Sequence, residues 1–409
     1  MKTLKLHTCR KSNIFTLSND RAFLIAESLI LLCCLQNLLF WPMINTSRGI
    51  LSLLCCSWLL FLSDTTLYHK NRYLPLLFLA LIIFGIDSIL DGVRYATLDL
   101  PFFCAIIIFN LKTKYKRKLL KFLTKSIGII VTLALIVYIP WLIFNFSPFL
   151  SFNPGLDAYE FTYDNFAVFI VASYSVFPRF SGPFIEPGHL GIVSVFLLYA
   201  NNFNFRANRY LYPILIGLLL SFSLAGIFLL SVALIIKNIS RIKMIIILSL
   251  TIGSVFFITV RSWNNGDNPI NILLVSRMEY DDEKGIVGNN RVSDSTDSFW
   301  KNFLEKKSLL FGLSTDEYLN QAAKGNIGGS GYKMYIIQYG LIKTLLVIAF
   351  YFFLGVGCRD KLYQMGFFII FLLTFFQRSY PLWFALFVPY ICGMKNLHRE
   401  NGQIHKRIS

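Results

Sequence analysis

SIGIIVTLALIVYIPWLIF, residues 126–144, is a continuous apolar run without a charged side chain. The hydrocarbon core of a bilayer is about 30 Å thick, and an α-helix needs roughly 20 apolar residues to cross it. Polar and apolar residues do not alternate here, as they would in the strands of a membrane β-barrel. The run therefore predicts a transmembrane helix.

Runs of the same kind recur along the chain, for example AFLIAESLILLCCLQNLLFW at 22–41. The 409 residues are 55% hydrophobic and only 15% charged, whereas a soluble domain has about 45–50% apolar and about 25% charged residues. The sequence thus predicts an all-α polytopic integral membrane protein with about twelve transmembrane helices. The expected spans are 22–41, 49–66, 73–90, 98–111, 126–145, 188–203, 210–221, 224–236, 244–260, 341–357, 363–377 and 380–394.

The segment 210–236 allows two interpretations. It could be one long helix, or two short helices that break at SFSLAG, residues 221–226. Two crossings fit the distribution of charge better, because a single crossing would move the basic stretch KNISRIK (237–243) to the outer side of the membrane.

Lysine and arginine outnumber aspartate and glutamate by 39 to 22, which gives a net charge of +17. In a soluble protein this excess would favour nucleic-acid binding, but in a membrane protein it is typical of the positive-inside rule. With the N-terminus in the cytoplasm, the short outer turns hold only Arg48, Arg94 and Arg378. We therefore expect cytoplasmic N- and C-termini, no nucleic-acid partner, and a basic run at 112–125 that anchors to anionic lipid.

Two outer segments, 146–187 and 261–340, are too long to be turns. Segments of this length in a compact protein are usually functional or disordered. The second contains spaced aromatic and aliphatic residues, and 292–307 predicts a short amphipathic helix. The expected organisation is an N-terminal transmembrane bundle (1–145), a first large outer loop (146–187), central transmembrane helices (188–260), a second large outer loop (261–340), and C-terminal transmembrane helices with a cytoplasmic tail (341–409).

The first outer loop ends in RFSGPFIEPGHLG, residues 179–191. Its glycines and prolines forbid a regular helix until the next span begins. Irregular backbone at membrane depth is tolerated only where it is buried in protein or lines a watery cavity. Ionisable groups there cost about 2.5–3.5 kcal/mol on insertion scales and favour a functional role. Arg179, Glu186 and His189 could therefore form a site, or Arg179 could bind a headgroup phosphate with Glu186 as a salt-bridge partner.

The pattern Arg-x-x-Gly-x-x-x-Glu-Pro at 179–187, late in the first outer loop, resembles the O-antigen and capsule repeat-unit polymerases of the O-antigen polymerase and ligase superfamily. The resemblance covers about residues 150–345. Ser221–Gly226 is similar to the family's Ser-x-Ser-Arg-x-Gly helix end, with Leu224 where an arginine is common. The other similar stretches, in the family's order, are Asn289-Asn-Arg291, Leu310-Phe-Gly312, Gly329-Ser-Gly-Tyr332 and Gln338-Tyr-Gly-Leu-Ile342.

The resemblance implies an enzyme of the bacterial inner membrane. Such polymerases transfer a growing glycan from undecaprenyl diphosphate to a new lipid-linked repeat unit at the outer, periplasmic face of that membrane. Their substrate is an undecaprenyl-diphosphate-linked oligosaccharide, they work within the lipid bilayer beside a flippase and a chain-length regulator, and they need no cofactor.

This chemistry needs cations for the leaving diphosphate and a base for the acceptor hydroxyl. A planar guanidinium suits bidentate phosphate contact, so Arg179 and Arg291 are the first candidates and Arg277 is the third. Glu186 is the candidate base, since Pro187 and the adjoining span could desolvate it, and His189 is the second. The expected substrate-binding residues are Arg277, Ser330, Tyr332 and Gly182.

No metal is expected, since the acidic run Asp281–Glu283 is better explained as a solvated turn. An O-antigen ligase has similar architecture and is the nearest alternative, but that enzyme carries a histidine in its second large loop. The histidines of this chain, at 7, 69, 189, 398 and 405, all lie outside 261–340. A flippase or other transporter is the alternative from another class, but its typical internal repeats are absent from the sequence.

Overall fold

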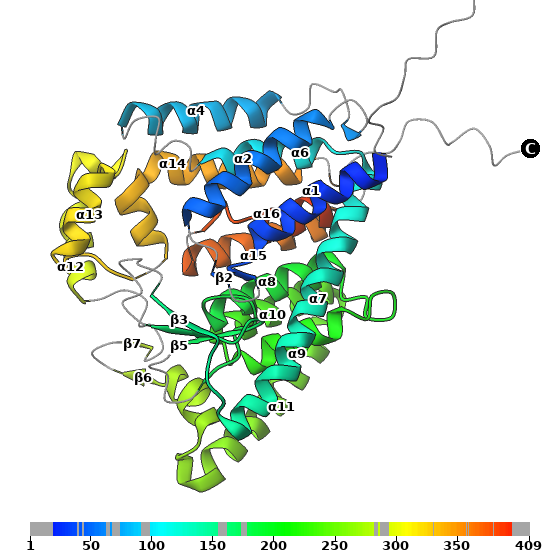
Figure 1. Ribbon diagram of the computed structural model, residues 1–409. Coiled ribbons are helices and arrows are strands. Elements are labelled where there is room, and N and C mark those ends of the chain that lie inside the picture. Colours follow the sequence, from blue (N-terminus) through cyan, green and yellow to red (C-terminus); the bar gives the residue numbers. More distant parts are fainter. Residues whose placement is uncertain are drawn as a thin grey trace, which may run out of the picture.

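The computed structural model of the chain is mostly helical. It describes residues 19–38, 41–42, 45–62, 66–67, 74–90, 99–153, 162–172, 178–281, 285–286, 294–329, 331–356, 358, 360–378 and 380–394. Each predicted span overlaps an apolar helix (Figure 1). These helices are α1 (Asn19–Cys34), α2 (Asn45–Phe61), α4 (Leu74–Leu90), α6 (Leu100–Asn110), α7 (Thr113–Phe144), α8 (Pro187–Ala200), α9 (Leu211–Leu220), α10 (Leu224–Lys237), α11 (Ile242–Ser262), α14 (Tyr332–Gly355), α15 (Lys361–Gln377) and α16 (Phe384–Gly393).

Two of these helices, α7 and α14, are long and apolar enough to cross a membrane by length and composition. The helical surface carries large apolar side chains that are more than half exposed. Water does not favour contiguous apolar patches of this kind, whereas hydrocarbon does. Exposed faces of α2, α4 and α7 therefore fit a membrane environment. Their most exposed members are Phe61, Phe78, Ile89, Ile136, Ile143 and Phe144.

The remaining elements are short. Strands β3 (Leu150–Phe152), β4 (Tyr163–Asn165) and β5 (Ile170–Ala172) form an antiparallel sheet, which the sequence analysis did not predict. The amphipathic helix predicted at 292–307 is confirmed as α12 (Asp294–Phe303), and α13 (Thr315–Ala323) follows it. In Figure 1, α12, α13 and strands β3 to β7 gather on one side of the bundle. The other strands are β1 (Asn37–Leu38), β2 (Trp41–Pro42), β6 (Tyr280–Asp281) and β7 (Gly285–Ile286). Short 3₁₀ helices are η3 (Ile239–Arg241), η4 (Trp263–Gly266), η6 (Ser276–Met278) and η7 (Lys307–Leu309), and η5 (Asn271–Val275) is a short π-helix.

One end of the bundle, here called the loop end, collects the ends of helices that are distant in sequence. The C-terminal parts of α1, α7, α9 and α15 meet the N-terminal ends of α8, α10, α14 and α16 there. The contacts that join them include the hydrogen bonds from Tyr138 Oη to Pro178 O (2.6 Å), from Phe180 N to Leu220 O (3.3 Å), from Ile185 N to Gln36 Oε1 (2.9 Å) and from Trp383 Nε1 to Cys34 O (3.1 Å).

The opposite end, here called the basic end, collects the complementary helix ends. The N-terminal ends of α1, α7 and α15 lie beside the C-terminal ends of α2, α8 and α10. The joining contacts are Lys118 Nζ to Asp20 Oδ1 (3.3 Å), Lys112 N to Thr66 O (2.8 Å), Asn201 Nδ2 to Thr124 Oγ1 (3.0 Å), Lys237 Nζ to Asn202 O (2.8 Å) and Tyr363 Oη to Tyr199 O (2.8 Å). The helix ends therefore fall into two groups, one at each end of the bundle. Helices that cross a membrane in alternating directions require this arrangement.

The segment 210–236 forms two helices that run in opposite directions. Phe222, between α9 and α10, has a φ of 44°, and this left-handed residue reverses the chain. Helix α10 runs parallel to α8, because Gly226 faces Gly191 near their starts and Lys237 bonds Asn202 at their ends. The prediction of two helices over 210–236 is therefore confirmed, and the single long helix is excluded.

Three helices have ends that differ from the predicted spans, for identifiable reasons. Helix α7 begins at Thr113, so the basic run 112–125 is the first part of this helix. Helix α1 ends at Cys34 because the N–H groups of Gln36 and Asn37 both donate to Pro183 O, at 3.3 and 3.0 Å. Helix α14 starts at Tyr332, inside the predicted second loop, and kinks at Gly340.

The second loop docks on that kink. Gly312 and Gly340 both have positive φ, 83° and 78°, and their backbones touch: a Cβ on Gly312 would lie 2.4 Å from Gln338 O, and one on Gly340 would lie 2.4 Å from Leu310 O. Ile342 N donates to Leu310 O at 3.1 Å. The loop also has a small core of its own, formed by Phe303, Leu313, Ile327, Met334, Ile336 and Ile337.

Gly312→Ala should undock the second loop. The substitution combines the cost of a left-handed backbone, about 1–2 kcal/mol, with a clash that costs about 1–3 kcal/mol more. Gly325→Ala is the matched control, because Gly325 has a φ of 70° but no atom within 4 Å of the added Cβ. Thermal unfolding of the purified protein in detergent should show a clearly larger fall in melting temperature for Gly312→Ala than for Gly325→Ala. Equal losses for both variants would contradict the docking.

Candidate functional site

The irregular segment 178–186 crosses the loop end and is held by its backbone groups. Phe180 N donates to Leu220 O at 3.3 Å, Ile170 N donates to Gly182 O at 3.2 Å, and Asn37 N donates to Pro183 O at 3.0 Å. The Ser181 hydroxyl donates to the Ile170 carbonyl. Because these groups have partners, the segment can lie buried among apolar helices without regular structure. Gly182 lies within this buried turn, and Arg179 is half-buried beside it.

Glu186 forms an ion pair with Arg378, which follows α15. Glu186 is the N-cap of α8 and has an extended backbone, with φ −125° and ψ 146°. Only 18% of its side chain and 12% of that of Arg378 are exposed. Arg378 also lies over the first turn of α8, since its Nη2 is 3.3 Å from the position of a Cβ on Gly188. The structure therefore gives Glu186 a cationic neighbour that the sequence analysis did not assign to it.

His189 lies in the first turn of α8 and is buried. Its Nδ1 is 3.0 Å from Gln36 Oε1, and the same oxygen accepts a hydrogen bond from Ile185 N at 2.9 Å. The donor at Ile185 N requires the amide oxygen, not the nitrogen, to face this pair. His189 thus carries its hydrogen on Nδ1, and in the neutral ring Nε2 is the basic nitrogen. Tyr380 and Trp383 flank the imidazole edge-on, with centroid distances of 5.7 and 5.4 Å.

Tyr332 reaches the same end of the bundle from α14. Its ring packs against Phe376 near the end of α15, with a centroid distance of 5.0 Å, and against Trp300 of α12 at 6.2 Å. Phe376 is close in sequence to Arg378. Thus the structure gathers Arg179, Glu186, His189 and Tyr332 at the loop end.

The other predicted site residues are placed elsewhere or not described. Arg277 lies in η6 of the second loop and is half-buried. Arg291 and Ser330 lie outside the described residues, as do the side chains of the acidic run 281–283. Among the residues that the structure describes, no group of three or more His, Cys, Asp or Glu side chains could hold a metal ion.

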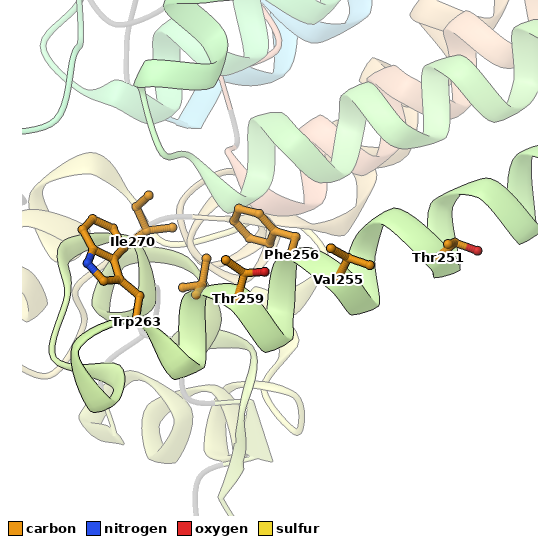
Figure 2. A pocket seen from close by; sticks show the side chains of 7 residues that line it. Thr251, Val255, Phe256, Thr259, Trp263 and Ile270 are labelled. Carbon is orange, nitrogen blue, oxygen red and sulfur yellow. The ribbon is translucent and has the colours of Figure 1, made fainter.

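An apolar hollow of about 540 Å³ runs along α11 (Figure 2). The hollow extends into the start of the second loop, where Trp263 and Ile270 form its lining. Its chemistry suits a hydrocarbon chain better than a sugar, because the lining is almost wholly aliphatic and aromatic. The other lining residues are Thr251, Val255, Phe256, Thr259 and Val260.

Comparison with protein-family models, curated proteins and solved structures finds no match to this chain. The resemblance to the O-antigen polymerases therefore rests on the motifs and their order.

Arg378 and Gln36 belong to the site in the structure but are not among the site residues predicted from the sequence. Arg378 was noted only as a charge in a short outer turn, and Gln36 was included in the predicted span 22–41. A signal was available for Arg378, since an arginine between two long apolar runs, 363–377 and 380–394, needs an anionic partner if it is not in water. Gln36 had no comparable signal, because its partners lie about 150 residues away.

A double-mutant cycle should show strong coupling between Glu186 and Arg378. Glu186→Gln, Arg378→Gln and the double variant would be compared by thermal unfolding in detergent. We expect a coupling of about 1–3 kcal/mol, since both groups are largely shielded. The control cycle uses Asp297→Asn and Lys333→Gln, a more exposed pair with 49% and 23% exposure and an Nζ–Oδ1 distance of 2.6 Å, which should couple by less than about 1 kcal/mol. Similar coupling in both cycles would refute the special role of the loop-end pair.

Proposed function

We propose that this protein is an integral membrane polymerase that joins lipid-linked glycan repeat units. The observation that carries the proposal is that Arg179, the Glu186–Arg378 ion pair and His189 all lie on or beside the irregular stretch that leads into α8 at the loop end. Ionisable groups on such backbone favour a functional site. The motif that supplies Arg179 and Glu186, and that ends two residues before His189, is the one that resembles the polymerases.

The twelve apolar helices are the proposed membrane spans. The basic end carries the lysines of the α7 start, Arg206, Arg209 and Lys237. The positive-inside rule then places this end in the cytoplasm, together with both termini. The loop end, with the two large loops, faces the periplasm of a bacterial cell in this orientation.

The proposed reaction is transfer of the glycan from undecaprenyl diphosphate to the acceptor repeat unit. The glycosidic bond to the diphosphate breaks, the diphosphate leaves with the bonding electrons, and the acceptor hydroxyl oxygen forms the new bond. Arg179, assisted by Arg277 and Arg291 of the second loop, would bind the departing diphosphate. Tyr332, Ser330 and Gly182 would belong to the glycan-binding surface.

The base that takes the hydroxyl proton is proposed to be His189 rather than Glu186. The Glu186 carboxylate faces Arg378, and a neighbouring cation makes a carboxylate a weaker base. The Nδ1–H of His189 points to Gln36, so the basic lone pair is on Nε2. Glu186 and Arg378 would then orient the start of α8, which carries His189.

The hollow along α11 is proposed to receive the polyprenyl chain. Its lining is apolar, and most of the lining side chains lie along α11, one of the proposed membrane spans. Arg277 lies a short distance along the chain from the lining residue Ile270. A prenyl chain in the hollow would therefore hold its diphosphate near the second loop.

The proposal is tested in a host that lacks its own polymerase but keeps the matching repeat-unit pathway. The protein should restore a ladder of surface glycan on a gel, and Arg179→Ala should leave only single capped repeats. Arg261→Ala is the control, since Arg261 is an exposed arginine paired with Glu279. Equal membrane levels are checked by blotting. If the parent chain fails to restore a ladder while the host's own polymerase does, the polymerase proposal fails, and assays for an O-antigen ligase and a flippase follow.

Gln36 should control the rate by orienting His189. Gln36→Leu removes the acceptor shared by Ile185 N and His189 Nδ1, and an unpaired buried donor costs about 1–3 kcal/mol. We expect chain extension with purified lipid-linked repeats to slow by about 10-fold or more. Gln36→Glu keeps an oxygen acceptor at this place and should retain more activity. Equal activities of the two variants would show that this hydrogen bond does not matter for the reaction.

A further inference from the structure

A second group of charged side chains is buried between α4, α6 and α14. Lys343 of α14 is ion-paired with Asp87 of α4, and its Nζ is 3.1 Å from Oδ1 of Asp99, which directly precedes α6. The three residues are 3%, 7% and 1% exposed. This cluster, here called the buried triad, has no part in the proposed glycan transfer.

The triad contains one cation and two acids. Lys343 is the cation that both carboxyl groups contact, and its Nζ also lies 4.2 Å from the ring centroid of Tyr339. Tyr335 is the other titratable side chain near the acids in the described part of the chain. With all three charged groups ionised, the cluster would hold a net negative charge inside the bundle. An uncompensated buried charge costs several kcal/mol.

One oxygen of the triad is available for a further ligand. Oδ2 of Asp99 is buried and has no hydrogen-bond partner among the described residues. Oδ1 of the same carboxyl group already contacts Lys343. A second positive charge would satisfy this oxygen and neutralise the cluster.

We propose that the buried triad binds one proton, which the carboxyl groups of Asp87 and Asp99 share. A hydronium ion of the solvent is the proton donor: an O–H bond forms at a carboxyl oxygen, the O–H bond of the hydronium ion breaks, and water leaves. Lys343 keeps its contact with the remaining carboxylate. Two carboxyl groups against one cation cannot both stay ionised at low cost, so one of them takes up the proton.

The proton site is linked to the docking of the second loop. Lys343 follows the kink at Gly340 by one turn, and the hydroxyl of the neighbouring Thr344 donates to Gly340 O at 2.7 Å. Gly340 is the residue on which Gly312 packs. A neutral triad would hold α4 and α6 against α14 and keep this kink in place. The inference is independent of the glycan chemistry.

The sign of the effect on stability is specific. Proton uptake stabilises the folded state, so the melting temperature of the parent protein should fall as the pH rises and the proton leaves. Asp99→Asn and Asp87→Asn each leave one carboxylate with Lys343 and need no proton. Both variants should therefore lose this decline and melt several degrees above the parent protein at alkaline pH. The double variant leaves Lys343 without a counter-ion and should melt below the parent at the pH values at which the parent holds its proton.

Asp297→Asn is the control for the melting experiment, because Asp297 is an exposed aspartate paired with a lysine. The melting temperature of this variant should fall with rising pH as that of the parent protein does. If both single variants at the triad melt below the parent at every pH, the two carboxylates are required in ionised form and the proposal fails.

Infrared spectroscopy tests the shared proton directly. Glu27 is a buried carboxyl group whose Oε1 also lacks a partner among the described residues, so the comparison uses a Glu27→Gln background. That protein should show the C=O stretch of a protonated carboxyl group, and either Asp87→Asn or Asp99→Asn should abolish it. A band that is absent before substitution, or that persists in both single variants, would overturn the proposal.

Discussion

The structure depends on a single constraint: irregular backbone buried among apolar helices must have all its polar groups paired. The backbone of segment 178–186 pairs with groups of four elements: the residues after α1, strand β5, the end of α9, and Tyr138 of α7. An unpaired buried N–H or C=O would cost several kcal/mol in a medium without water. The partners therefore fix where α1 ends and how α9 is placed.

This constraint also explains the position of the ionisable groups. The segment stops just before α8, so Glu186 and His189 stand at the start of a helix, with Arg378 above it. A helix N-terminus favours an anion, and the ion pair with Arg378 adds to that preference. Gln36, which pairs with Ile185 N to satisfy the backbone, also pairs with His189. One amide oxygen thereby serves both the fold and the candidate site.

The sequence was sufficient for the parts of the fold that depend on local apolar content. It predicted each apolar helix, the reversal near Phe222 and the amphipathic helix α12. It could not predict that α7 continues back through its basic run, because lysines have good helix propensity and extend a helix without an apolar signal. It also could not predict the pairing of Glu186 with Arg378 or of His189 with Gln36. Those pairs depend on which helix ends meet in space, and apolar periodicity contains no information about partners so distant in sequence.

The two buried charge clusters obey the same rule in different ways. At the loop end, the Glu186 carboxylate is paired with the Arg378 guanidinium, and both side chains are partly exposed. In the triad, two acids face one lysine with almost no exposure, so the balance is incomplete without a further positive charge. An unpaired charge is costly where water is excluded and much less costly where water can reach it. A buried cluster whose acids outnumber its cations is therefore more informative about function than a partly exposed pair of one acid and one cation.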